Sequence, residues 1–150
     1  MSRLAESLFA LAITLWVGAL WAIGYISAPV LFASVADTGF AGSLAGKQFA
    51  IVAWLGIGCG LYLIAYLLFR EGLKAFKGVL LWLVLLMLLL TLAGHFGVTP
   101  VVEKLRLDPA REVVESVVRS RFATWHGIAS LLWMIQSVLG VALVTQVVRK

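Results

Sequence analysis

Hydrophobic positions along the chain gather into long stretches with almost no polar interruption. A helix needs about 20 apolar residues to cross a ~30 Å hydrocarbon core. Leu80–Leu92 reads LLWLVLLMLLLTL, without the alternation of a membrane β-strand. The pattern therefore predicts an all-α, four-transmembrane-helix bundle, forming one integral membrane domain over residues 1–150. Its predicted spans are 8–33, 48–69, 78–98 and 122–147.

Composition supports a membrane protein. The chain is 63% hydrophobic and 13% charged, with a mean hydropathy of +1.06. Soluble domains are about half apolar and about a quarter charged, so a soluble globular protein is excluded. The pI of 9.8 does not point to nucleic acid, because the cations sit in tails and loops, as membrane topology places them. We expect the lipid bilayer as partner, and no nucleic acid.

The loop Arg70–Lys77 (REGLKAFK) has three cations in eight residues. The positive-inside rule places such a loop in the cytoplasm, and both termini then lie on the same side. The first apolar run is too long for a signal peptide and is interpreted as an uncleaved helix. We expect a multi-pass protein of the inner (cytoplasmic) membrane, with both termini cytoplasmic.

The last helix is predicted to be long. Asp108 would cap it, with Pro109 at its first position, and no helix breaker follows before the C-terminus. About 40 residues would measure ~60 Å at 1.5 Å per residue, so the helix would extend beyond the membrane on the outward side. Two alternatives stay open: residues 109–121 lie along the membrane surface, or the helix breaks near Ser120.

Small residues and one proline mark candidate helix contacts. Small side chains let helices approach closely in lipid, and Pro29 should bend or end the first helix. Asp37 or Thr38 would cap the second helix. Thr99 and Pro100 are expected to end the third span, and we expect no internal repeat. The predicted packing residues are Gly18, Gly24, Pro29, Gly42, Gly46 and Gly127.

Two histidines are the main candidates for chemistry. His95 lies near the end of the third span and His126 near the start of the fourth, so both would lie ~5 Å below the outward interface. Ionisable residues inside a membrane often mark function. A hydrogen-bonding structural role is one interpretation and a proton or substrate relay another. A third is a metal site in which both imidazoles bind haem b, copper or zinc.

A polar stripe accompanies His126 along the last span. Ser130 follows four residues on and Ser137 eleven, with Gln136 beside it, so the stripe is predicted to face the bundle interior. Such a seam serves interhelical hydrogen bonding or a substrate path. No Gly-x-Ser-x-Gly, His-Glu-x-x-His or Walker sequence occurs, so we expect a non-enzymatic protein.

Several segments resemble the transmembrane protein 205-like family, in bacteria a domain of unknown function. Arg121–Ser130 is similar to its Phe-x-x-x-His-Gly-x-Ser signature, and Ser27–Phe32 resembles the end of its first helix. Ala45–Phe49 and Thr99–Arg106 are similar to its elements before the second helix and after the third. Val101 departs from the family's basic residue after the proline. The resemblance implies a four-helix integral membrane protein and no established reaction, although animal members are associated with drug resistance and export.

The leading hypothesis is a non-enzymatic membrane protein. Its polar seam around His126 would support packing, partner binding or small-solute binding. The first alternative is a haem b- or metal-binding redox protein using His126 and His95. The second is a small transporter or exporter, which would need to form a homo-oligomer or join another membrane protein.

Overall fold

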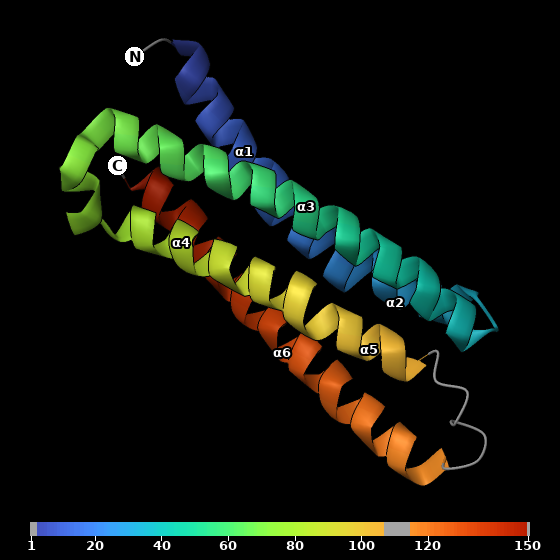
Figure 1. Cartoon of the computed structure of the whole chain (residues 1–150). Coiled ribbons are helices and arrows are strands. Elements are labelled where there is room, and N and C mark those ends of the chain that lie inside the picture. Colours follow the sequence, from blue (N-terminus) through green and yellow to red (C-terminus); the bar gives the residue numbers. More distant parts are fainter. Residues whose placement is uncertain (1–2, 107–114, 150) are drawn as a thin grey trace.

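The computed structural model describes residues 3–106 and 115–149, all in helices or the short connections between them (Figure 1). The all-α prediction is confirmed. Two short π-helical turns and one 3-10 turn lie between helices in the described part of the chain. In chain order the elements are α1 (Arg3–Trp21), η1 (Ala22–Ser27), α2 (Ala28–Ser34), α3 (Thr38–Glu71), η2 (Gly72–Lys77), α4 (Val79–Leu92), η3 (Ala93–Val98), α5 (Thr99–Arg106) and α6 (Glu115–Val148).

The described helices provide four candidate membrane spans, as predicted. They run up and down, so both termini and η2 lie at one end of the bundle, called here the terminal end (Figure 1). The turn between α2 and α3 lies at the opposite, far end. Helices α1 and α4 each pack against both α3 and α6, so α1 and α4 occupy diagonal corners. The candidate spans are Arg3–Ser34, Thr38–Lys77, Val79–Arg106 and Ser120–Val148.

Helix α3 begins well before its apolar run, because Asp37 caps it. The Asp37 carboxylate accepts hydrogen bonds from the backbone N–H groups of Gly39 (2.8 Å) and Phe40 (3.1 Å), which satisfies donors that a helix start leaves open. The capping prediction is thus confirmed at Asp37. Helix α3 ends at Glu71 and is followed by Gly72, whose φ of 56° lies in the region that favours glycine.

The long last helix is confirmed. Helix α6 has 34 residues, or about 51 Å at 1.5 Å per residue, against a ~30 Å hydrocarbon core. It runs without interruption through Ser120, so the alternative of a break there is wrong. The predicted cap, Asp108 with Pro109, lies outside the described residues, as do residues 110–114.

The first and third spans share an interruption that the sequence analysis missed. In each, a π turn directly precedes a short helix with proline at its second position, Pro29 or Pro100. The N–H of Ala28 donates to the Ile23 carbonyl, and the N–H of Thr99 to the Gly94 carbonyl, each five residues back. Proline disrupts the regular ladder, and a π turn accommodates it. The prediction that Thr99 and Pro100 end the third span is therefore wrong, since the helix continues to Arg106.

The two interruptions lie 71 residues apart. The π turns begin at residues 22 and 93 and end at 27 and 98, and the prolines are residues 29 and 100. The same spacing aligns residues 54–64 (WLGIGCGLYLI) with residues 125–135 (WHGIASLLWMI), and Asp37 with Asp108. These features of the two halves therefore recur at one constant spacing. This corrects the expectation that no internal repeat is present.

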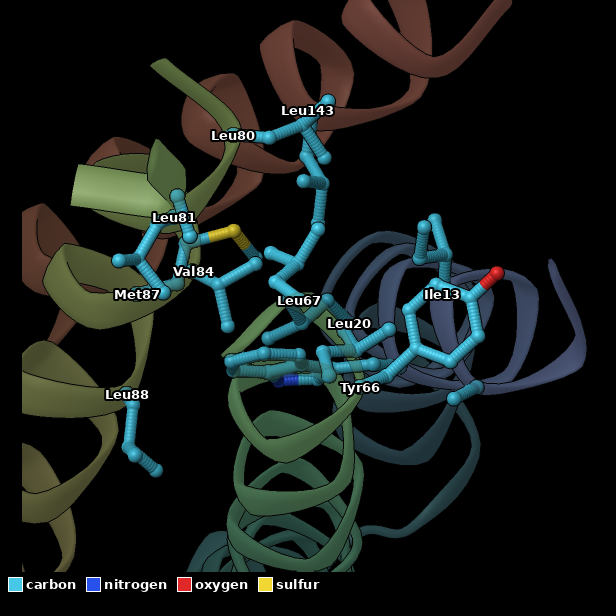
Figure 2. Close-up of a cluster of buried hydrophobic side chains, with 14 of the residues drawn as sticks. Ile13, Leu20, Tyr66, Leu67, Leu80, Leu81, Val84, Met87, Leu88 and Leu143 are labelled. Atoms are coloured by element: carbon cyan, nitrogen blue, oxygen red, sulfur yellow. The ribbon is translucent and has the colours of Figure 1, made fainter. Parts of the chain in front are cut away.

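The hydrophobic core fills the bundle from its middle toward the terminal end. Figure 2 shows Ile13 and Leu20 of α1, Tyr66 and Leu67 of α3 and Leu143 of α6 among the α4 side chains. Buried polar side chains, in contrast, lie nearer the far end, next to the π turns.

Candidate functional site

A buried polar contact joins α4 to α6 directly before η3. The side-chain amide of Gln136 donates to the Thr91 hydroxyl and, at 3.4 Å, to the Met87 carbonyl. The Thr91 hydroxyl itself donates to the same carbonyl at 2.9 Å. Thr91 is 6% exposed and Gln136 5%. In lipid such contacts hold helices together because their groups would otherwise lack partners.

A second polar contact joins η1 to α3. The Ser27 hydroxyl donates to the Gln48 side-chain oxygen at 2.8 Å, and the pair is partly buried. Sequence reasoning did not identify this pair. The available signal was Gln48, a polar residue at the first position of a predicted span.

Each π turn lies against a tryptophan from one of the two helices without a π turn. Trp133 of α6 packs onto Gly24 of η1 so closely that a Cβ there would overlap the indole nitrogen. Trp54 of α3 meets His95 of η3 edge to face, with ring centroids 5.4 Å apart. The Trp133 indole N–H is buried, and among the described residues it has no hydrogen-bond partner. A buried N–H without a hydrogen-bond partner lowers the stability of a fold and is rare, which makes this indole nitrogen the most unusual polar atom near the π turns.

The predicted seam on α6 divides into two parts. Gln136 and Ser137 are buried, and the Ser137 hydroxyl donates to the Trp133 carbonyl. His126 and Ser130 are exposed, and the Ser130 hydroxyl donates to the His126 carbonyl. The inward orientation predicted for His126 and Ser130 is therefore wrong. The first turns of α6 lie beside α5 and apart from α2 and the start of α3 (Figure 1), so helical periodicity alone does not bury them.

The two histidines have different neighbours. His95 is half-buried between Trp54 and the adjacent ring of Phe96. His126 stacks on Phe122, with centroids 5.7 Å apart and an interplanar angle of 10°. No contact joins the imidazoles in the described part of the chain. Nor do residues 3–106 and 115–149 contain three or more His, Cys, Asp or Glu side chains grouped to hold a metal ion.

Among the predicted packing residues, Gly24 lies against Trp133 and Gly42 near Arg106 and Phe32. A Cβ at Gly18, Gly46 or Gly127 would meet nothing within 4 Å. Pro29 lies in the first turn of α2.

Three further close glycine contacts were missed by the sequence analysis. Gly56 and Gly60 receive the ring of Trp16, and a Cβ at Gly140 would be 3.2 Å from Val17. The four-residue spacing of Gly56 and Gly60, typical of close helix contacts, could have indicated the first of these.

Four antiparallel apolar helices with buried interhelical hydrogen bonds define an α-helical integral membrane protein. Residues 11–111 match the family model described as a domain of unknown function, DUF4149, and the chain belongs to that family. The match ends before Arg121–Ser130, and the transmembrane protein 205-like name is not confirmed. No curated protein and no solved structure matches the chain.

Proposed function

We propose that this chain is a non-enzymatic membrane protein that binds a small solute, and conducts it, between its two interrupted helices. The matched π turns before Pro29 and Pro100 carry this proposal. Hydrophobic segments that Gly and Pro interrupt at corresponding positions of two halves mark binding sites in many transporters. π turns likewise occur frequently at functional sites.

The side chains around the π turns indicate the solute class. Trp54, His95 and Trp133 provide aromatic surfaces, and Ser27 and Gln48 provide neutral hydrogen-bonding groups. No Asp, Glu, Lys or Arg belongs to either π turn. These features favour a small neutral molecule with an apolar or aromatic part and a hydrogen-bond acceptor. A bundle of this size would form a path by association of copies or with another membrane protein.

The proposed location is the cytoplasmic membrane, with both termini in the cytoplasm. The basic turn that contains Lys74 and Lys77 lies at the terminal end, as do Arg3 and Arg149 (Figure 1). The positive-inside rule favours this orientation. The resemblance to a family whose animal members are associated with export supports the proposed transport, not this orientation. The rival haem or copper site between His95 and His126 gains no support from the contacts of these rings.

Cysteine accessibility tests the proposed site. In a Cys59→Ser background, a cysteine replacing Ser27 or Gly97 should react with a small water-soluble thiol reagent in proteoliposomes. A cysteine replacing Leu89, which is exposed on the lipid-facing surface of α4, is the matched control and should stay unreactive. If none of the three reacts, no aqueous path reaches the π turns and the proposal is wrong.

Solute flux tests the same proposal more directly. Small neutral aromatic solutes would be tested for entry into proteoliposomes, and flux should fall when His95 is replaced by Ala. The His126→Ala variant is the control, because its ring lies on the outer surface. An equal flux in both variants and in empty liposomes would contradict transport.

A further inference from the structure

The connection η2 at the terminal end has three chemically distinct edges. In a 3-10 helix the side chains at positions i and i+3 eclipse each other. Gly72 and Ala75 therefore share one edge, Leu73 and Phe76 a second, and Lys74 and Lys77 a third. A six-residue turn thus separates small, apolar and basic side chains completely.

On the small edge Ala75 faces the protein, whereas Gly72 is exposed. Ala75 is 1% exposed and belongs to the hydrophobic core cluster. The backbone N–H of Gly78 donates to the Ala75 carbonyl at 2.9 Å, and the indole N–H of Trp82 donates to the Phe76 carbonyl at 2.9 Å. These bonds fix the turn against the start of α4, so its other two edges have a fixed orientation.

The apolar edge faces outward. Leu73 is 85% exposed and Phe76 48%. Phe69, Val79 and Trp82, which flank the turn in sequence, are also exposed. In water this would be an unfavourable apolar patch. At the end of a membrane span, the same side chains reach the acyl boundary, where tryptophan is also enriched.

The basic edge is exposed and carries unpaired charge. Lys74 and Lys77 have no ion-pair partner within the described residues. Arg70, one turn back on α3, donates to the Tyr66 hydroxyl at 3.4 Å. Residues 69–82 therefore contain three basic side chains and a single acidic one, Glu71.

We infer that η2 is a binding site for an anionic phospholipid of the leaflet at the terminal end. The phosphate lies between Lys74 and Lys77, and the acyl chains lie along Leu73, Phe76 and Trp82. A turn in bulk water would not expose Leu73 and Phe76, and one in hydrocarbon would not expose two lysines, so η2 lies in the headgroup layer. Basic residues at such a position attract anionic lipids, and the fixed turn presents both ammonium groups on one side.

Native mass spectrometry of the full chain in detergent tests the inference, with equimolar phosphatidylglycerol and phosphatidylcholine as probes. The wild-type chain should retain phosphatidylglycerol selectively. Lys74→Gln/Lys77→Gln should reduce that affinity about tenfold or more, as expected for two cations near an anionic headgroup. Lys74→Arg/Lys77→Arg should retain it.

The matched control is Lys47→Gln/Lys104→Gln, which removes the same charge from exposed lysines at the far end. It should leave the selectivity unchanged. Equal loss in both glutamine variants would show attraction by net charge alone and would overturn the site. Wild-type binding without headgroup preference would also overturn it, as would complete displacement of the lipid by inorganic phosphate. Leu73→Ser/Phe76→Ser should weaken retention of both lipids.

Discussion

Replacing Gly56 with Ala should destabilise the bundle through a single contact. Trp16 is fully buried, and its indole nitrogen lies where a Cβ on Gly56 would stand. The neighbouring ring atoms Cε2 and Cδ1 would be only 3.0 and 3.1 Å from that Cβ. The large, rigid ring is enclosed on all sides, so it cannot move away freely. Overpacking of this kind costs about 1–3 kcal/mol.

Gly58 is the matched control for this prediction. It also lies inside α3, but a Cβ there would meet nothing within 4 Å. Alanine favours a helix over glycine at both positions, so this gain cancels in the comparison. Gly56→Ala should therefore unfold with a free energy about 1–3 kcal/mol lower than Gly58→Ala.

The measurement is unfolding in mixed micelles by titration with a denaturing detergent, followed by circular dichroism. Trp16→Phe removes the overlapping ring atom, so Gly56→Ala should cost less in that background, and a double-mutant cycle measures the coupling. The indole nitrogen has no hydrogen-bond partner in the described structure, so the cycle isolates packing. The reasoning would be refuted by equal stability of the Gly56→Ala and Gly58→Ala proteins.

Three further predictions use the same unfolding measurement. Gln136→Leu should lower the free energy of unfolding by about 0.6–2 kcal/mol. The same substitution should cost much less in a Thr91→Val background, and an equal cost in both backgrounds would show that the two side chains act independently. Asp37→Ala should cost about 1 kcal/mol and Asp37→Asn much less; equal costs would exclude the capping role. His126→Ala should change stability by less than about 0.5 kcal/mol, because the ring is exposed, whereas His95→Ala should cost more. A visible haem band lost in His126→Ala would instead support the rival haem hypothesis.

Much of the architecture followed from the sequence because lipid imposes strong rules. Four apolar runs of sufficient length allow one main solution, a bundle of spanning helices. Asp37 was predictable as a cap because its side chain acts locally, on backbone groups two and three residues ahead. The predicted span 48–69 began later than α3 because the apolar run set its start, whereas the cap at Asp37 determines where the helix itself begins.

The candidate site was harder to predict because it depends on tertiary geometry. Helical spacing placed His126 and Ser137 on one inward-facing stripe, but only Ser137 is buried, since the first turns of α6 lie apart from α3. The contact of Trp133 with Gly24 joins segments more than a hundred residues apart and leaves no local signal. Proline alone did not predict a π turn either, because it more often kinks or ends a helix.

The two halves share their backbone interruption but not their side-chain chemistry. A proline at the same position in each half can impose the π turn whatever side chains surround it. At the 71-residue spacing, His95, Ser27, Thr91 and Gln136 each correspond to an apolar or small residue of the other half, whereas Gln48 corresponds to Arg119. The pairs are Gly24 and His95, Ser27 and Val98, Leu20 and Thr91, and Ala65 and Gln136. The proposed solute would meet the His95 imidazole and the exposed ring of Trp54 at one π turn, and Ser27 with Gln48 at the other. A symmetric backbone with unlike sides fits a single solute held in one orientation, and replacing His95 or Ser27 should alter recognition differently.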